Sequence, residues 1–348
     1  MNNINEELLN IIIEKIIKEY KDDVSLVCVY GPYLDEIDSG NSDIKLYLVP
    51  KTNKAYDLCS SFIIQGKGYD IYAMTYERLE KIANFDEDSV PLIDEAKIIY
   101  AASEEDILKF NEFKERIKKT KASIISLDLM EKADDHLNKA MSYYYKCIIE
   151  SEIGEIRRIS GEILNILSNC IAIMNNTYIK NGIENQLAEV KQLLYVPLGF
   201  EKMYDNIIVS NNVDEIKEKL FDIIKSTRVL YGKLLNKALY KKDPKKVLSG
   251  VYEELVSTWN KIYAACDKGD YRLAFLAGSY LQNQINKTNV ECEFDKVDFM
   301  KFFNKDDLKG FKLEIMRAEK GFLDNLNSNS VEIKVYDTMD EFVQSNMK

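Results

Sequence analysis

The spacing of apolar residues changes about 100 residues into this chain of 348 residues, and that change constrains the fold more than any other feature. Before it, short β-branched runs predict strands. After it, apolar residues recur every three or four positions to about residue 325, which predicts helices. We therefore expect an α+β fold, in which a small mixed sheet precedes an all-helical region. The predicted strands are Val24–Tyr30, Ile44–Val49, Phe62–Ile64, Tyr69–Met74 and Ile98–Tyr100.

Helical spacing also marks the segment before the first strand. Residues 5–20 carry an apolar face that includes Leu9, Ile13 and Ile16, and they predict a leading helix. A lone late strand is predicted at Val331–Tyr336. Breaks in the helical pattern suggest three domains: 1–115 with the sheet, 116–240 as a helical bundle, and 241–348 as an additional helical region.

Composition excludes several classes of function. The formal net charge of -11 argues against broad nucleic-acid binding, which depends on clustered cations. Six scattered cysteines and a single histidine, His136, argue against a Cys/His zinc site. No run approaches the roughly 20 apolar residues of a membrane span, and residues 1–7 lack the basic start of a secretory signal. We expect a cytoplasmic protein with reduced thiols and no membrane partner.

One stretch has the spacing that phosphoryl chemistry needs. The strand ending at Tyr30 runs into Gly31-Pro32, and a polar turn then leads to Ser42-Asp43-Ile44-Lys45. Two carboxylates two residues apart on a strand point to one face of the sheet, where they hold Mg²⁺ through oxygen atoms. Asp43 is the first such carboxylate, Lys45 stands at the second position, and Asp70 on a later strand is a candidate third.

These residues resemble the nucleotidyltransferase superfamily, whose pattern is Gly-Ser, a short turn and Ser-Asp-x-Asp/Glu. More narrowly, the chain looks like the kanamycin nucleotidyltransferase group of aminoglycoside-modifying enzymes. The shared features are the leading helix ending in Lys21-Asp22-Asp23-Val24, the strand into Gly31, the Ser42-Asp43-Ile44 triplet and Asp70. The motif covers residues 5–100, a looser likeness continues to about 238, and residues 240–348 have no counterpart.

The resemblance implies transfer of a nucleoside monophosphate from a nucleoside triphosphate to a hydroxyl of a small molecule such as an aminoglycoside. Asp43 and Asp70 would bind Mg²⁺. Gly31, Ser42 and Lys45 fall where the nucleotide is contacted. Asp135 or Glu131, on the first long helix, would be the base that activates the acceptor. Because that group shares its active site between two subunits, the chain is expected to be a homodimer, or a monomer if its extra helices cover the same surface.

Two departures from the pattern make catalysis uncertain. Pro32 replaces the serine after the glycine and offers neither a hydroxyl nor an N–H. Lys45 replaces the second metal carboxylate, and an ammonium about 4 Å from a divalent ion costs about 8 kcal/mol at an effective dielectric of about 20. The ammonium could instead hold phosphate directly. Two hypotheses follow: a nucleotidyltransferase, or a non-catalytic descendant (a pseudoenzyme) that binds a ligand or a protein partner.

Each candidate residue also has a plainer interpretation. Asp70 and Lys45 could be solvated residues on a polar strand face. Asp128, Glu131 and Asp135 share one helical face, and such a charge stripe is usually just exposed to water. His136 beside them is more often structural than catalytic.

Overall fold

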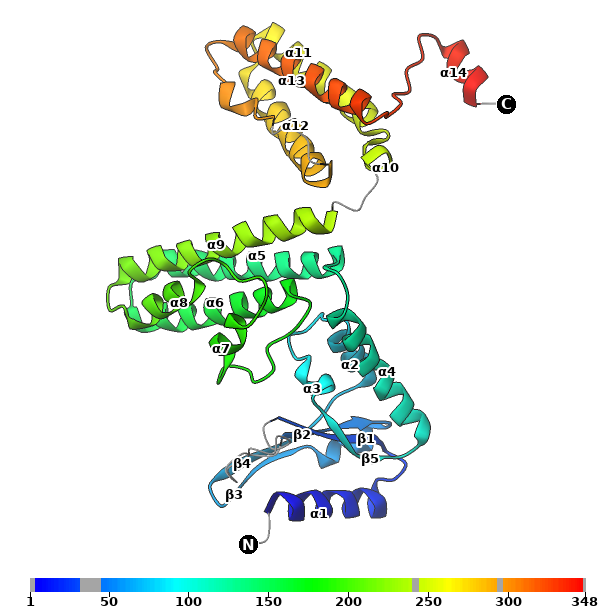
Figure 1. The fold of residues 1–348 in the computed structure, drawn as a ribbon, viewed down its shortest axis with the longest axis vertical. Coiled ribbons are helices and arrows are strands. Elements are labelled where there is room, and N and C mark those ends of the chain that lie inside the picture. Colours follow the sequence, from blue (N-terminus) through cyan, green and yellow to red (C-terminus); the bar gives the residue numbers. More distant parts are fainter. Residues whose placement is uncertain (1–3, 32–44, 240–243, 293–296, 347–348) are drawn as a thin grey trace. The chain divides into compact units, whose positions relative to one another are not determined.

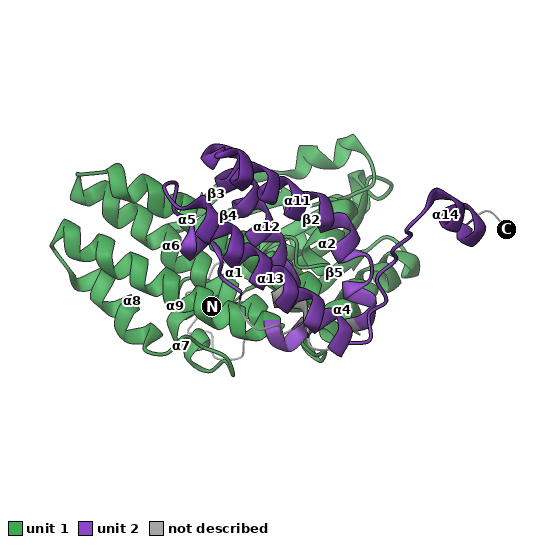
Figure 2. Cartoon of the chain, turned by 90° about the horizontal axis from the view of Figure 1, so that it is seen from above, with its two compact units in different colours: residues 1–235 green, residues 236–348 purple. Residues whose placement is uncertain are grey.

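A computed structural model describes residues 4–31, 45–239, 244–292 and 297–346 of the chain. It divides into two compact units, residues 1–235 and 236–348, which Figure 2 shows in different colours. Among the described residues, no helix combines the length and the apolarity that a membrane crossing requires.

The first unit begins with a five-stranded mixed sheet, drawn in blue to cyan in Figure 1. Its strand order is β3-β4-β2-β1-β5, with β2 and β4 parallel and the other neighbours antiparallel. A parallel pair needs a crossover connection, and here the chain crosses from β2 through η2 and β3 to β4. The elements are β1 (Val24–Tyr30), β2 (Lys45–Pro50), η2 (Asn53–Leu58), β3 (Ser60–Ile64), β4 (Lys67–Ala73) and β5 (Lys97–Ala101).

The two faces of the sheet differ because side chains alternate along each strand. One face packs against the leading helix α1 (Ile4–Glu19), where Ile12 and Ile16 meet Val27, Leu46 and other apolar residues in one buried cluster. The opposite face carries tyrosines and charged residues. That second face lies toward the helices that follow the sheet, and it forms the site described below.

Helices make up the rest of the first unit, and α5 and α6 pack along each other as an antiparallel pair (Figure 1). Ser126 caps α5 by accepting a hydrogen bond from the Leu129 amide. The helices are α2 (Tyr76–Ala83), α3 (Pro91–Asp94), α4 (Glu104–Lys121), α5 (Leu127–Ile149), α6 (Ile153–Met174), α7 (Gln186–Lys191), α8 (Phe200–Val209) and α9 (Val213–Leu239).

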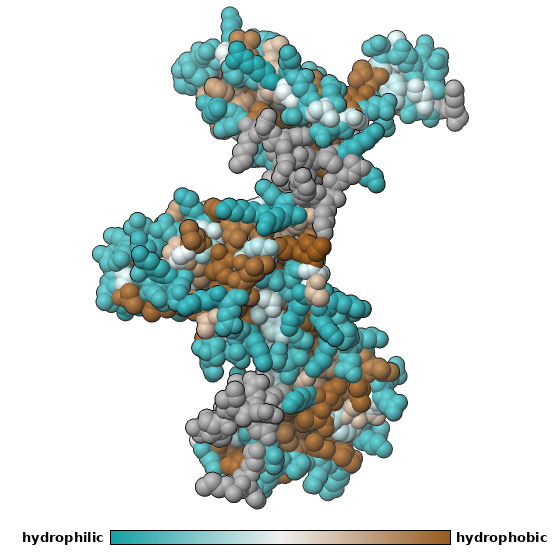
Figure 3. Space-filling model, viewed as in Figure 1, coloured by the Kyte–Doolittle hydropathy of each residue, from teal (hydrophilic) through white to brown (hydrophobic). Residues whose placement is uncertain are grey.

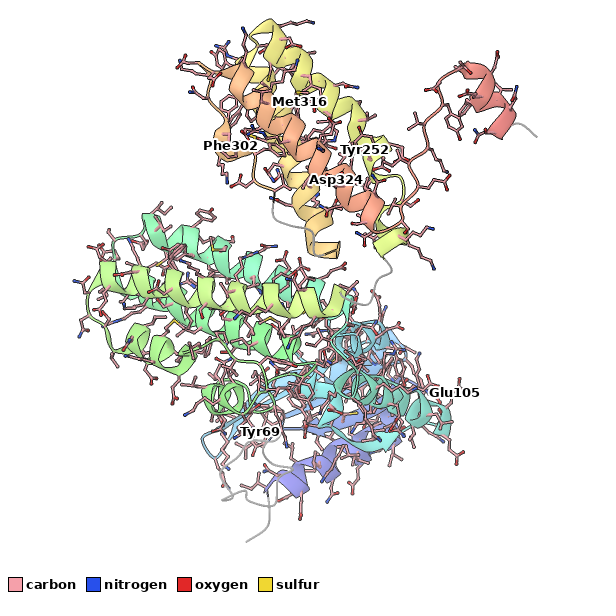
Figure 4. All side chains as sticks on the ribbon, turned by 45° about the horizontal axis from the view of Figure 1, so that its top comes forward. Tyr69, Glu105, Tyr252, Phe302, Met316 and Asp324 are labelled. Carbon is pink, nitrogen blue, oxygen red and sulfur yellow. The ribbon has the colours of Figure 1, made fainter. Side chains whose placement is uncertain are left out.

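The second unit has its own apolar core. Trp259 is fully buried, and its ring centroid lies 6.3 Å from that of Phe299. At the edge of this core, Tyr252, labelled in Figure 4, donates a hydrogen bond of 2.9 Å to Glu319. The elements are α10 (Pro244–Leu248), α11 (Val251–Lys268), α12 (Tyr271–Cys292), η3 (Met300–Phe302), α13 (Leu308–Ser328) and α14 (Met339–Asn346).

The structure confirms the expected fold class, a small mixed sheet followed by an all-helical region. All five predicted strands are present within a few residues, although Ile44 lies outside the described residues. The late strand predicted at Val331–Tyr336 is wrong, because this segment has no strand partner among the described residues. Val331 packs instead into the second unit's core. The proposed division at residue 115 stays a prediction.

Candidate functional site

A row of polar side chains crosses one end of the sheet on the face opposite α1. Lys45 on β2 is the register partner of Tyr30 on β1 and of Asp70 on β4, and Asp70 is paired in turn with Ser61 on β3. Register partners point to the same face, so these four side chains lie together. Lys45, Asp70 and Ser61 are exposed. The Ser61 hydroxyl donates a hydrogen bond of 2.7 Å to Asp70.

A second row of side chains lies behind the first on the same face and is largely buried. Tyr47 and Tyr72 are register partners, and the Tyr72 hydroxyl donates a 3.0 Å hydrogen bond to the hydroxyl of Tyr30. The Tyr47 hydroxyl donates a 2.7 Å bond to the carbonyl oxygen of Leu92 in α3. Burial raises the pKa of Tyr30, Tyr47 and Tyr72, so all three phenols remain neutral near pH 7.

Gly31 ends β1 beside this row. Its φ of +93° lies in a region that side-chain-bearing residues rarely adopt. A Cβ added at Gly31 would lie 3.8 Å from the Cδ atom of Lys45, which is an ordinary contact. The glycine is therefore required by the backbone turn rather than by lack of space.

A cavity of about 430 Å³ opens above the two rows. Tyr30, Gly31, Lys45 and Tyr72 form its sheet side. The remaining walls come from the segment around α3, from α6 and from the residues up to the start of α7. They are rich in amides and carboxylates: Asp88, Glu95, Asn165, Asn169, Asn181, Glu184 and Gln186. A cavity of this size holds a small molecule, and its walls offer many groups that can bind hydroxyls.

A second cavity of about 620 Å³ continues over β3 and β4. It shares Tyr30, Lys45 and Tyr72 with the first cavity and adds Asp70 and Tyr69. Tyr69 is labelled in Figure 4, and its ring stacks on that of Phe62 with centroids 5.7 Å apart. Lys45 therefore stands where the two cavities meet.

The charges around the first cavity are largely paired. Lys180 lies 3.1 Å from Glu95, and His136 of α5 lies 2.7 Å from the Asp88 carboxylate. Lys45 differs, because its ammonium group has no hydrogen bond or ion pair with any residue that the structure describes. The sequence of residues 32–44, just before Lys45, contains four acidic residues and no lysine or arginine, so this segment supplies no further cation. The ammonium group of Lys45 is therefore available to bind an anionic ligand.

His136 bonds through both ring nitrogens. Nε2 faces the Asp88 carboxylate, and Nδ1 lies 2.8 Å from the carbonyl oxygen of Lys132. Both partners are acceptors, which favours the imidazolium, the form in which both ring nitrogens donate. Burial lowers the pKa of His136, but the hydrogen bond and charge of Asp88 outweigh burial and raise it. The ring thus pairs with Asp88 at the cavity wall, where the Asn169 amide also approaches this carboxylate at 3.4 Å.

The structure brings together some of the residues predicted from sequence. Gly31, Lys45 and Asp70 lie at one end of the sheet, beside the cavities. Ser42 and Asp43 lie outside the described residues, so their roles stay predictions. Glu131 and Asp135 are exposed on α5, and neither lines either cavity; a role as base stays a prediction for both.

Sequence reasoning missed the residues that form the cavity walls. Asp88 and Ser89 sit in a short polar loop before Pro91, and Asn165 and Asn169 project from α6 four residues apart. Amides at that spacing on an otherwise apolar helix share one face. That spacing was the signal available for Asn165 and Asn169, whereas nothing in the sequence places Asp88 opposite the sheet.

The described residues do not fit a two-metal site. At this end of the sheet Asp70 contributes a carboxylate, but its register partner on β2 is the ammonium of Lys45. Among described side chains, no group of three or more typical metal ligands gathers anywhere. Asp43 could add one more carboxylate, and the position of Lys45 would still be cationic.

Comparisons with known proteins add little to this geometry. No protein-family model and no curated protein sequence matches the chain. Among solved structures, the chain is similar to one described as a nucleotidyltransferase-like protein from Exiguobacterium sibiricum 255-15, at 10% sequence identity and a TM-score of 0.37. The match covers 68% of this chain and 81% of that one. A likeness at this level assigns no activity, so the functional argument rests on the sheet, its register and the cavities.

Proposed function

We propose that this chain is a nucleotidyltransferase-fold protein that binds a nucleoside phosphate without two-metal catalysis, with Lys45 holding the phosphates in place of a metal-bound carboxylate. The observation that carries the proposal is the register of β2 and β4, which puts Lys45 beside Asp70 on the open face of the sheet. The Gly31 turn and the Ser42-Asp43-Ile44 triplet supply the resemblance to the family.

The chemistry of the cavities supports binding. An ammonium offers three N–H donors and a full charge to phosphate oxygens. Gly31 lines the same cavity, and the neutral phenol of Tyr30, which accepts a hydrogen bond from Tyr72, can donate one to the ligand. The sugar or base would lie against the amides of Asn165 and Asn169. Phosphoryl transfer relies on metal ions to neutralise the developing charge, and one lysine supplies less charge than two such ions.

Calorimetric titration with ATP, with and without Mg²⁺, tests the proposal. We expect ATP to bind with an affinity that Mg²⁺ changes less than about threefold. A hydrogen bond to a charged group contributes about 1.5–3 kcal/mol, so Lys45→Ala should weaken binding by about 10-fold to 150-fold. Lys97→Ala is the matched control, because Lys97 is an exposed lysine of the same sheet that lines neither cavity. Strictly Mg²⁺-dependent binding, or no binding, would contradict the proposal.

Transfer of a nucleoside monophosphate to a small hydroxylated molecule, such as an aminoglycoside, is a second candidate. One observation favours it: carboxylates line both cavities, Asp88 in the first and Asp70 in the second. In this case Asp43 and Asp70 would bind Mg²⁺, and Asp135 or Glu131 would activate the acceptor. Incubation with Mg²⁺, labelled ATP and a panel of aminoglycosides and polyols would then release pyrophosphate, which the binding proposal excludes.

The cellular setting is part of the same proposal. The net charge of -11 and the free cysteines fit a small-molecule ligand in the cytoplasm better than a nucleic-acid partner.

A further inference from the structure

An apolar groove lies on the second unit. Tyr271, Phe275 and Leu276 of α12 and Phe303 after η3 line a hollow of about 540 Å³, which we call the aromatic groove. The ring of Phe303 packs edge-on against Phe275, with centroids 5.0 Å apart. Leu276 is 66% exposed and Phe275 is 45% exposed. Exposed apolar residues that gather in one place mark an interaction site.

The helix α14 has an apolar face that the described part of the chain leaves largely exposed. Met339, Phe342 and Val343 lie at i, i+3 and i+4 and share one face. They are 74%, 44% and 41% exposed, and no residue of α14 is buried. In Figure 3 apolar residues show on the stretch of chain that leads to α14, and the side of α14 that faces the viewer is mainly polar. The ring of Phe342 packs on Tyr336 of the preceding segment, with centroids 5.3 Å apart.

A helix of this length needs a supporting surface. α14 has eight residues, whereas isolated helices shorter than about 12–15 residues are marginal in water. Its stability must therefore come from packing of its apolar face. Eight residues make a rod of about 12 Å, which is short enough to be accommodated along a groove formed by two turns of α12 and the residues around Phe303.

The charges of the helix and the groove are complementary. Asp340 and Glu341 lie in the first turn of α14. Arg272 and Lys305 line the aromatic groove. The Arg272 guanidinium lies over the Tyr271 ring at 4.7 Å, and Lys305 has only its exposed neighbour Asp306 as an ion-pair partner. An acidic helix end would orient itself against these cations.

The groove is reached more easily by another copy of the chain. The amide of Lys334 is fixed to Glu253, near the start of α11, by a hydrogen bond of 2.8 Å. From there, the four linker residues 335–338 span about 14 Å at most, while the stretch of α11 from Glu253 to Lys268 is about 23 Å long. The groove begins at Tyr271, three residues beyond Lys268, so within one chain a linker of about 14 Å does not bring the start of α14 to it. A second copy meets no such constraint.

We propose that α14 of one copy docks in the aromatic groove of a second copy, and that two such reciprocal contacts form a homodimer. The same two surfaces meet twice around a twofold axis, which is the common arrangement in homodimers. Met339, Phe342 and Val343 then cover Phe275 and Leu276, while Asp340 and Glu341 face Arg272 and Lys305.

Sedimentation equilibrium of the full chain tests this proposal. We expect a dimer at micromolar concentration, and Phe342→Asp or Leu276→Asp should each raise the dimer dissociation constant at least 100-fold. Met316→Asp is the matched control, because Met316 is a 49% exposed residue of α13 in the same unit, outside the groove. Circular dichroism should be unchanged in all three variants, because each replaces an exposed side chain.

Mixing the two variants decides between docking in another copy and docking in the same chain. Phe342→Asp keeps an intact groove and Leu276→Asp keeps an intact α14, so the mixture should form heterodimers through one remaining contact. Charge reversal at Arg272→Glu should weaken the dimer about tenfold, and Asp340→Arg in the same chain should restore it. A monomeric full chain, equal loss with Met316→Asp, or a mixture that stays monomeric would each overturn the proposal.

Discussion

Replacement of Lys45 by aspartate should turn the open end of the sheet into a divalent-cation site. Lys45 and Asp70 are partners on parallel strands, where neighbouring backbones lie about 4.8 Å apart. An ion bound by Asp70 would then lie about 5 Å from the charge at position 45. For exposed groups with a dielectric constant of about 80, a divalent and a unit charge at that distance interact by about 2 kcal/mol.

This energy predicts a graded series. Lys45→Ala removes a repulsion of about 2 kcal/mol and should tighten binding about 20-fold, because 1.4 kcal/mol is a factor of ten. Lys45→Asp adds an attraction of similar size and should tighten it about 400-fold relative to the natural chain. Both factors shrink as salt screens the charges, so the comparison belongs at low ionic strength.

Electron paramagnetic resonance of Mn²⁺, used in place of Mg²⁺, measures the free ion and gives the three dissociation constants. Lys97→Asp is the control, because it introduces the same carboxylate on β5, away from both cavities. Equal affinities for the natural chain, Lys45→Ala and Lys45→Asp would refute the assigned register. So would an equal gain from Lys97→Asp.

Three further changes test other parts of the structure. Gly31→Ala should lower the free energy of unfolding by about 1–2 kcal/mol in urea denaturation, because its φ of +93° strains a residue with a side chain. Trp259→Ala should cost the second unit about 3–5 kcal/mol in the same assay, because a fully buried ring is lost. His136→Gln should destabilise the protein below pH 6.5, and the difference from the natural chain should disappear as the pH rises through the raised pKa of His136.

The His136 prediction has a definite sign. The folded state binds the proton more tightly than the unfolded state, because Asp88 accepts a hydrogen bond from the charged ring. The stabilisation is therefore complete below the unfolded pKa of about 6.5. Lys132 and Lys139 also lie near the ring on α5, and the charge of Lys139 opposes the effect of Asp88 on the pKa of His136. Thermal melts between pH 5 and 9 measure the effect, and a difference that grows with pH would contradict the assignment.

The sequence predicted the strands well because their signals are local. Val24–Tyr30 is a short uncharged β-branched run, and its predicted bounds match those of β1. The late strand failed for a physical reason. The segment 331–336 has the composition of a strand, but a strand needs a partner edge, and the helices around it offer none.

The site was only partly predictable. The alternation of side chains along a strand predicted that positions 43 and 45 share one face of the sheet. The family pattern then predicted a further acidic residue on a later strand, which is Asp70. That β2 and β4 pair in parallel, with Lys45 opposite Asp70, depends on the crossover through η2 and β3. The cavity walls depend on how α3 and α6 pack over the tyrosines. These are long-range contacts, and a single sequence does not encode them as a local pattern.

A crystal structure soaked with a nonhydrolysable ATP analogue and Mg²⁺ is the most direct test of the central claim. The account predicts phosphate oxygens within about 3 Å of the Lys45 ammonium, with no metal ion bridging Asp70 and the phosphates. Two ions held between Asp43, Asp70 and the triphosphate, with the Lys45 side chain turned away, would contradict it.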